Sequence, residues 1–304
     1  MNTTDLESLK TQAQGGDTAA QLRLGQMYLD GQGVSQDQQE AAQWYAMAAN
    51  AGHVGGISSL AALYQVGWGV DLDEARALEL YEQAAAMGDH HSQLAAAKMI
   101  VEGEGKEKDM KRAALWLTMA VEADEPEVDA LVLLGLMYHN GDGVEQDHTK
   151  AFLLIDKASE RGSEAATAML ERMPTDYIIP VAEMGNPAAQ LLLGTRYMNG
   201  IGINRDFKRA YELYLASAQQ DYAGAQYNLG MMYHNGIGRR HDYHEARKWY
   251  EMAAQQGHPG AQRVMPVISC LCESEKKSEK KEENKGCSFS FILIGIFIAV
   301  ILAL

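Results

Sequence analysis

The chain has 304 residues, with 26 Lys and Arg against 41 Asp and Glu and a formal net charge of −15. This acidic balance argues against nucleic acid as a partner, because nucleic-acid binding needs a cationic surface. Helix-forming residues dominate and the period-two alternation of half-buried strands is absent, so we expect an all-α protein.

The N-terminal segment, residues 1–16, fits one helix that ends at Gly16. It carries neither a basic n-region nor an apolar run, so we expect no secretory signal peptide. From Leu6 onward it matches the second half of the repeat described next, without the first half. We therefore expect residues 1–16 to be a capping helix that covers the open end of a repeat array.

Six copies of a Gly-x-Gly turn follow. In every copy an Asp lies four residues after the second glycine, and an Ala lies four residues after that Asp. The first three copies are 36 residues apart, a period typical of solenoids. The turn residues are Gly31, Gly33 and Asp37; Gly67, Gly69 and Asp73; Gly103, Gly105 and Asp109; Gly141, Gly143 and Asp147; Gly200, Gly202 and Asp206; and Gly236, Gly238 and Asp242.

Each turn position has a physical reason. Gly31 follows an apolar helical segment and suits the left-handed conformation of a helix C-cap, and Gly33 permits a tight turn. Asp37 is suited to cap the N-terminus of a second helix. Glu40, like Glu245 in the last copy, has the spacing of a capping box. Each copy therefore predicts two antiparallel helices joined by the turn.

The aromatic residues of the copies recur at core spacing. In the first copy Trp44 and Tyr45 lie on the buried stripe of the second helix, and Tyr28 lies on the first helix. The small Gly25 and Ala41 permit a close approach of the two helices. We therefore interpret the aromatic positions as packing positions.

The whole pattern, an Ala-rich first helix with Leu-Gly and Tyr, the turn, then Trp-Tyr and Ala-Ala, resembles the Sel-one-like repeat family. Residues 20–52 and 225–257 match it most closely, and the resemblance covers residues 17–257. It implies a right-handed superhelical α-solenoid of antiparallel helix pairs and an adaptor role, and it brings no catalytic residues. Some secreted, cysteine-rich members are proposed to act on β-lactams, but the repeats here contain no Cys.

The repeats are interrupted once, by a short copy that lacks the Gly-x-Gly turn. There Pro174 is expected to separate two short helices, Pro180 disfavours a regular second helix, and the superhelix is expected to kink. The helical pattern ends after Pro266. The expected parts are a capping helix at 1–16, four helix-pair repeats at 17–162, the degenerate short repeat at 163–185, two helix-pair repeats at 186–257, a C-terminal cap at 258–272, a charged flexible linker at 273–287 and a transmembrane tail anchor at 288–304.

The transmembrane prediction depends on residues 288–304, which hold no charge. Seventeen helical residues rise about 25 Å, slightly under the roughly 30 Å hydrocarbon core. Five Lys precede the segment, so the positive-inside rule places the repeats in the cytoplasm. We expect a single-pass, C-terminally anchored membrane protein. The alternative is an apolar helix that docks on the solenoid or on a second subunit.

Charge is distributed unevenly. Residues 1–185 carry 12 Lys and Arg against 30 Asp and Glu, whereas residues 186–269 carry 9 against 6. The acidic residues 1–185 favour a cationic or neutral partner; the alternative is that these acids only form a solvated face. The weakly basic second part suits the anionic cytoplasmic leaflet of a membrane.

The sequence predicts no catalytic, cofactor or metal site. Cys270, Cys272 and Cys287 all lie near the C-terminus, and His241 and His244 form a pair without further ligands. The Gly-x-Gly turns follow no strand and precede no Lys-Ser or Lys-Thr, so they are not phosphate loops. The candidate interaction surface comprises polar residues at two helix ends and in the last turn: His139, Asn140, His234, Asn235, Arg239 and Arg240.

We expect a non-enzymatic scaffold, tethered to a membrane, that binds an unidentified protein or peptide on the concave surface of the solenoid and needs no cofactor. Two alternatives stay open. One is a bacterial effector that uses the same scaffold at a host membrane. The other is a hydrolase for cell-wall or β-lactam substrates, as proposed for the cysteine-rich relatives.

Overall fold

The computed structural model describes residues 3–274 and 276, and the regular structure of these residues is entirely helical. The helices are α1 (Thr3–Gln14), α2 (Thr18–Asp30), α3 (Gln38–Asn50), α4 (Val54–Val66), α5 (Glu74–Ala86), α6 (His90–Glu102), α7 (Met110–Val121), α8 (Val128–Asn140), α9 (His148–Glu160), α10 (Glu164–Arg172), α11 (Thr175–Glu183), α12 (Pro187–Asn199), α13 (Phe207–Ala218), α14 (Ala223–Asn235) and α15 (Tyr243–Gln255). Residues 259–274 form a further helix. Within this part of the chain, no helix is both long and apolar enough to span a membrane. The predicted transmembrane segment, 288–304, lies outside the described residues.

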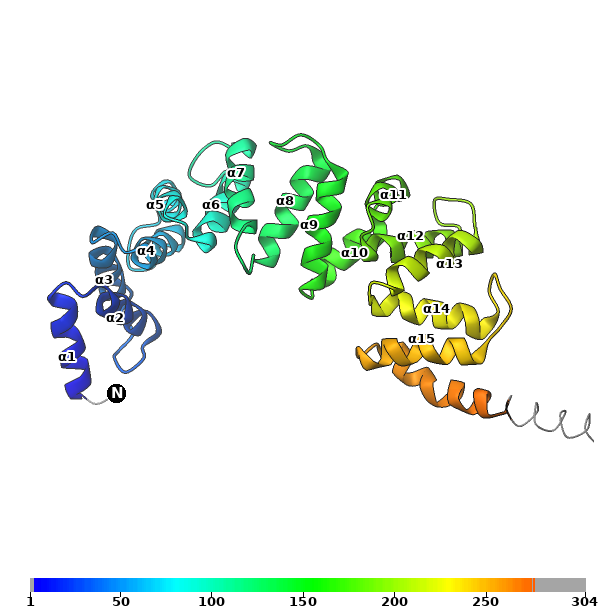
Figure 1. Ribbon diagram of the computed structural model, residues 1–304. Coiled ribbons are helices and arrows are strands. Elements are labelled where there is room, and N and C mark those ends of the chain that lie inside the picture. Colours follow the sequence, from blue (N-terminus) through cyan, green and yellow to red (C-terminus); the bar gives the residue numbers. More distant parts are fainter. Residues whose placement is uncertain (1–2, 275, 277–304) are drawn as a thin grey trace, which may run out of the picture. The chain divides into compact units, whose positions relative to one another are not determined.

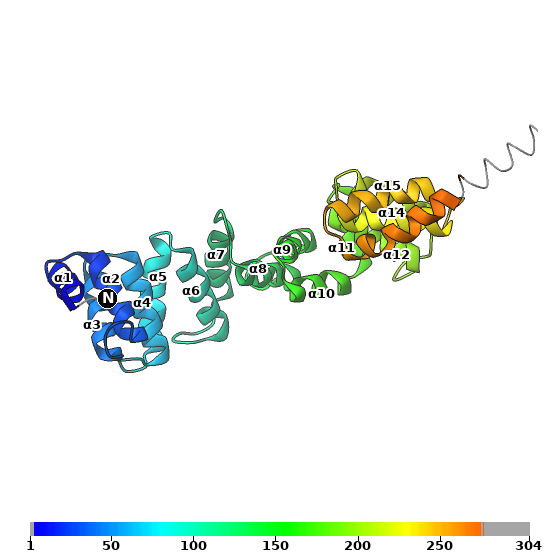
Figure 2. The same cartoon turned by 90° about the horizontal axis from the view of Figure 1, so that it is seen from below.

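The chain divides into two compact units, residues 1–172 and 173–304. The first unit holds α1 to α10, and the second holds α11 to α15 and the helix at 259–274 (Figure 1). In each unit a first helix packs against the second helix of its repeat, which packs against the first helix of the next repeat. The view from below shows the same serial order within each unit (Figure 2). The expected all-α solenoid of helix pairs is therefore confirmed.

The turn inside a repeat is stabilised by one cap on each side. Gly31 ends α2 with a left-handed backbone, φ 71°, and donates its N–H to the carbonyl of Met27. The Asp37 carboxylate accepts the N–H groups of Gln39 and Glu40 at 3.0 and 3.1 Å. The corresponding cap pairs are Gly67 with Asp73, Gly103 with Asp109, Gly141 with Asp147, Gly200 with Asp206 and Gly236 with Asp242.

The predicted capping boxes at Glu40 and Glu245 are wrong. A capping box needs the backbone N–H of the N-cap residue, but Asp37 donates its N–H to the carbonyl of Tyr28 at 2.9 Å. In the last copy the N–H of Asp242 likewise goes to a tyrosine carbonyl in the preceding helix, at 3.0 Å. The N-cap aspartate therefore binds the two helices of the repeat to each other, in addition to capping the second one.

The second glycine of the turn contacts the preceding repeat. At Gly69, with φ 71°, an added Cβ would lie 1.9 Å from the carbonyl oxygen of Gln38 at the start of α3. At Gly143 an added Cβ would lie 2.2 Å from the carbonyl oxygen of Met110 at the start of α7. Glycine is required here by the left-handed backbone and also by the main chain of the neighbouring repeat.

A buried glutamine near the start of a first helix also links it to the preceding repeat. Gln21 donates from Nε2 to the carbonyl of Ala13 at 2.9 Å, and Gln226 donates to the carbonyl of Ala218 at 3.4 Å. The same bond is made by Gln93 and Gln190. The acceptor lies in the last turn of the preceding helix, where carbonyls lack an intrahelical donor. This link did not emerge from the sequence pattern.

The short copy at 163–185 contains two helices separated at Pro174, as predicted, and Pro174 precedes α11 as its N-cap. The expectation that Pro180 would disrupt the second of them is wrong, because α11 continues through it to Glu183. Pro180 removes one backbone hydrogen bond. Ile178 and Val181, on either side of it, are fully buried, and their burial offsets the loss.

The prediction that the helical pattern ends after Pro266 is also wrong, since residues 259–274 are helical throughout. Ile268 and Cys272, four residues apart, are buried at 0% and 2% exposure. Ile268 packs in one cluster with Ala246 and Tyr250 of α15. Tertiary packing therefore extends the helix beyond the proline, at which a local pattern would end it.

Two glycine substitutions separate backbone strain from the contact between repeats. Gly52 and Gly69 both have positive φ, but nothing lies within 4 Å of an added Cβ at Gly52. Gly52→Ala is expected to cost about 1 kcal/mol in the free energy of unfolding, from backbone strain alone. Gly69→Ala is expected to cost about 1–3 kcal/mol more, because the two main chains must move apart. Urea denaturation of the full chain measures both, and equal costs would contradict the contact.

Candidate binding surface

The core tyrosine of a second helix crosses the first helix of its repeat. Tyr45 of α3 covers Gly25 of α2 so closely that an added Cβ would lie 2.5 Å from the ring. Its hydroxyl donates to Oε1 of Gln26 at 3.2 Å. Equivalent crossings are Tyr214 over Gly194 and Tyr250 over Gly230. The crossing carries a hydroxyl group from the core to the edge of the exposed face of the first helix.

These phenols stay protonated at neutral pH. Burial raises the pKa of Tyr45 to about 12, with a smaller contribution from Asp30. Tyr81 has the same repeat position in the second repeat, and burial raises its pKa to about 12, with a smaller contribution from Asp89. Burial raises the pKa of Tyr214 as well, and its hydroxyl lies 3.1 Å from the Thr195 hydroxyl. The crossing tyrosines are therefore neutral hydrogen-bonding groups.

In the second unit, a pocket of about 390 Å³ lies between its two complete repeats. Its lining residues come from α12, α13 and α14 and from the two turns: Met198, Asn199, Arg205, Phe207, Tyr214, Asn228, Met231, Met232 and Ile237. Tyr214 and Met232 are buried, whereas Phe207 is partly exposed. The lining is therefore mainly apolar, and it also contains a phenol, two carboxamides and a guanidinium group.

The chemistry of this pocket suits a side chain of a peptide. Met198 and Met231 offer flexible, polarisable apolar surface that adapts to the shape of a ligand. The carboxamides of Asn199 and Asn228 can donate to a carbonyl and accept from an N–H group. Arg205 lies over the ring of Phe207, with 5.9 Å between its guanidinium carbon and the ring centroid.

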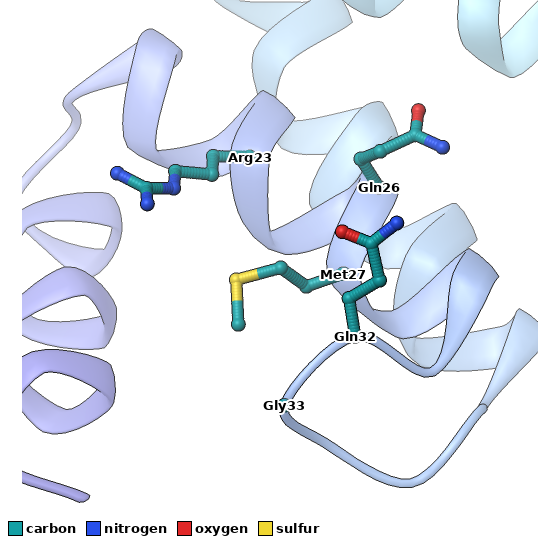
Figure 3. A pocket seen from close by; sticks show the side chains of 5 residues that line it. All are labelled: Arg23, Gln26, Met27, Gln32 and Gly33. Atoms are coloured by element: carbon teal, nitrogen blue, oxygen red, sulfur yellow. The ribbon is translucent and has the colours of Figure 1, made fainter. Parts of the chain in front are cut away.

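A second pocket, of about 340 Å³, lies in the first unit beside α2. Figure 3 shows its lining residues on α2 and on the turn that follows: Arg23, Gln26, Met27, Gln32 and Gly33. Gln26 and Gln32 both donate from Nε2 to the Asp30 carboxylate, at 2.7 and 3.3 Å. The same position in the repeat architecture is therefore polar in the first unit and apolar in the second.

The predicted interaction residues are divided between the two units: His139 and Asn140 lie in the first, and His234, Asn235, Arg239 and Arg240 lie in the second. In the first unit His139 is half-buried, and its ring centroid is 5.3 Å from that of His148. Asn140 is exposed and donates to the Asp142 carboxylate at 3.0 Å. The helix end is therefore stabilised locally at His139, while Asn140 faces solvent.

In the second unit His234 is also a packing residue. Its Nδ1 lies 3.5 Å from the hydroxyl of Tyr250, and its ring meets Tyr243 edge-on at 5.7 Å. Asn235, the last residue of α14, is exposed. Asn199 has the same place at the end of α12 and lines the apolar pocket. The sequence offered this signal, because Asn140, Asn199 and Asn235 share one repeat position.

Arg239 and Arg240 have different environments. The guanidinium carbon of Arg239 lies 3.8 Å from the ring centroid of Tyr211 and 4.3 Å from that of Tyr233. The two tyrosine hydroxyls are 3.1 Å apart, and Tyr233 has its pKa raised to about 12, first by burial and then by this hydrogen bond. Arg240 is exposed. Arg239 therefore has a packing role, which sequence reasoning missed.

The residues described contain no group of three or more His, Cys, Asp or Glu side chains arranged to hold a metal ion. His241 is exposed, with its ring centroid 5.4 Å from that of Tyr243. Cys270 is exposed, whereas Cys272 is buried and donates from Sγ to the carbonyl of Tyr243 at 3.2 Å.

Comparison with known proteins agrees with this repeat geometry. A family model described as the Sel1 repeat matches residues 18–53, 57–89, 90–125, 128–163, 187–222 and 223–258. A protective antigen of uropathogenic Escherichia coli with an SLR fold is 29% identical, with a TM-score of 0.54 over 86% of this chain and 59% of that chain. This chain therefore spans less than two thirds of that antigen. A Sel1 repeat protein from Oxalobacter formigenes is 32% identical over 86% of this chain and 80% of that chain, with a TM-score of 0.49. No curated protein matches the sequence.

The two neighbouring arginines provide a matched pair of substitutions. Arg239→Ala is expected to lower the free energy of unfolding by about 1 kcal/mol, because two cation–π contacts are lost. Arg240→Ala is expected to change it by less than about 0.5 kcal/mol, since this side chain is exposed. Urea denaturation of the two variants makes the comparison. An Arg239 variant as stable as the Arg240 variant would show that the ring contacts contribute nothing.

Proposed function

Because the chain belongs to the Sel1 repeat family, whose repeats generally mediate contacts between proteins, we propose that it is a scaffold that binds a peptide segment of a partner protein along the exposed faces of its first helices. Proteins of this family are generally non-catalytic. The effector alternative uses the same scaffold and differs only in location. The hydrolase alternative is favoured by no observation in the described part of the chain.

The observation that carries this proposal is the apolar pocket of the second unit. Recognition of a peptide requires a place for an apolar side chain and polar groups that orient the backbone. Met198, Met231 and Phe207 provide the apolar walls, while Asn199 and Asn228 provide the carboxamides. An extended segment that inserts one apolar side chain between the repeats would use both sets of groups.

The two units would favour segments of different charge. Residues 1–172 carry 12 Lys and Arg against 28 Asp and Glu, and residues 173–304 carry 14 against 13. The acidic first unit would attract cationic segments and repel acidic ones. The nearly neutral second unit, with Arg205 in its pocket, would accept neutral or acidic segments. One chain would thus hold two partner segments of different chemistry.

We also propose that the scaffold is tethered to a membrane through residues 288–304. Support comes from composition: seventeen successive residues without a charge follow a segment with five Lys. A helix of this length nearly matches the hydrocarbon core, and the lysines suit the cytoplasmic side. The proposed topology leaves the repeats in the cytoplasm.

Peptide binding can be tested with phage-displayed 12-residue peptides selected on the full chain. We expect Met231→Glu to weaken the selected peptides at least about tenfold, because a charge in an apolar pocket loses its hydration. Met252→Glu is the control, since Met252 lies on second helix α15 and is 38% exposed. It should change affinity by less than about twofold. Equal effects of both variants, measured by fluorescence polarisation, would refute a role for the pocket.

The membrane tether predicts that the full chain sediments with membranes and resists extraction at alkaline pH. Ile294→Lys combined with Ile298→Lys should release it, because each charge near the centre of a span costs about 3 kcal/mol. Ile294→Leu combined with Ile298→Leu should remain with the membranes and serves as the matched control. A double-lysine variant that still resists extraction would contradict the proposed span.

A further inference from the structure

Residues 41–70 contain no Asp, Glu, Lys or Arg, although charged residues make up 22% of the chain. This segment covers most of α3, all of α4 and the start of the following turn. Three large apolar side chains at and just beyond its end are exposed: Val66 by 50%, Trp68 by 49% and Leu72 by 61%. We call these three residues the apolar turn.

The apolar turn is particular to the second repeat. The repeats on either side carry polar residues at the same three positions: Asp30, Gln32 and Gln36 before it, and Glu102, Glu104 and Lys108 after it. The fold itself therefore does not require apolar residues there. A cluster of large apolar side chains that solvent reaches, at positions that tolerate polar residues, is typical of an interaction site.

Leucine at position 72 also gives up a stabilising bond. In the first repeat Gln36 donates from Nε2 to the carbonyl of Leu29 at 2.8 Å. In the fourth repeat Gln146 donates to the carbonyl of His139 at 2.7 Å. Leu72 occupies the same repeat position, and its side chain has no hydrogen-bond donor. At this position the second repeat thus lacks the side-chain hydrogen bond to the helix end and exposes most of a leucine side chain instead.

The surroundings of the apolar turn are acidic. Gln65 donates to the Glu104 carboxylate at 3.2 Å, and Glu74 accepts the N–H of Gly105 at 3.2 Å. These bonds keep the turn of the third repeat beside that of the second. Across the turns of the first three repeats, eight acids stand against two cations: Asp30, Asp37, Asp71, Asp73, Glu102, Glu104, Glu107 and Asp109 against Lys106 and Lys108.

We propose that the apolar turn binds a basic segment of a partner protein that presents a large apolar side chain between lysines or arginines. The indole of Trp68 would cover the apolar side chain, as tryptophan commonly does at the centre of an interface. The flanking acids would attract the basic residues, increase the association rate and exclude acidic segments. The inference rests on the scaffold function proposed above but uses a different surface from the pocket of the second unit.

The test uses the full chain and a labelled synthetic peptide with a central Leu-Phe pair and three lysines on each side. The variant combines Val66→Asn, Trp68→Gln and Leu72→Gln, residues that the chain itself uses at these positions in other repeats. Its net charge is unchanged, so weaker binding reports the apolar contact. We expect the dissociation constant to rise at least about tenfold. Leu115→Gln, at a site 58% exposed on α7, is the control and should change it less than about twofold.

Two further probes separate apolar from electrostatic binding. A peptide with Gln-Gln in place of Leu-Phe should bind the wild-type chain as weakly as the original peptide binds the triple variant. A peptide with glutamates in place of the lysines should not bind. If the triple variant binds the original peptide as tightly as wild type, attraction is only a general property of the acidic surface and the inference is overturned.

A second measurement does not depend on the stability of the triple variant. The emission of Trp68, obtained as the difference between wild type and Trp68→Phe, should shift to shorter wavelength when the peptide binds. An unchanged emission would overturn the inference. So would a wild-type dimer, seen by sedimentation, that dissociates in the triple variant, because the occupant would then be a second molecule of this chain. The scaffold function would survive any of these failures, provided that Met231→Glu still weakened the binding of the phage-selected peptides.

Discussion

Successive repeats meet where the turn of one lies against the first residues of the preceding second helix. At Gly69 and Gly143 the carbonyl oxygen of the neighbouring repeat occupies the space that a Cβ would take. Main-chain atoms cannot be trimmed or repacked as side chains can, so this contact sets how closely two repeats approach. At the other end of the helices, adjacent repeats are also joined by the buried glutamine bond, for example from Gln226 to Ala218. Because each contact involves only adjacent repeats, the architecture can be extended without changing its interior.

Packing between repeats restricts the side chains of the interior. The side chains that differ most in chemistry from repeat to repeat therefore lie on the exposed faces of the first helices and in the turns. The polar pocket around Gln26 and the apolar pocket around Met231 occupy related places in different units. The apolar turn at Trp68 adds a third kind of surface. One backbone geometry thus presents three chemistries, which suits a scaffold that holds more than one partner segment.

The repeat position of Arg239 shows how the interior itself can vary. This position is Val34 in the first copy and Val144 in the fourth. In the last copy the guanidinium group lies between the rings of Tyr211 and Tyr233. Two ring faces replace the apolar walls that a valine would need, and they interact favourably with the cation. A basic residue in a turn can therefore be a packing residue, even where the sequence alone favours a surface role.

The sequence by itself determined the helix pairs of the six Gly-x-Gly repeats and their ends, because these depend on residues close together in the chain. A left-handed glycine and an N-cap aspartate satisfy backbone groups within about four residues. The capping boxes failed because the N–H of Asp37 is taken by Tyr28, nine residues earlier. The helices through Pro180 and Pro266 were decided by burial against neighbouring helices, which no local pattern contains.

Tertiary structure alone decided the candidate binding surfaces. The apolar pocket joins Met198 to Met231, which lie in adjacent repeats, and its walls exist only once those repeats are packed. The same holds for Arg239, whose ring partners come from α13 and α14. The exposure of a side chain is likewise decided by the fold. Trp44 and Trp68 are both tryptophans within repeats, but Trp44 is 8% exposed and Trp68 is 49% exposed. Local chemistry therefore determines where the helices of the six Gly-x-Gly repeats begin and end, whereas packing between repeats determines which side chains remain exposed.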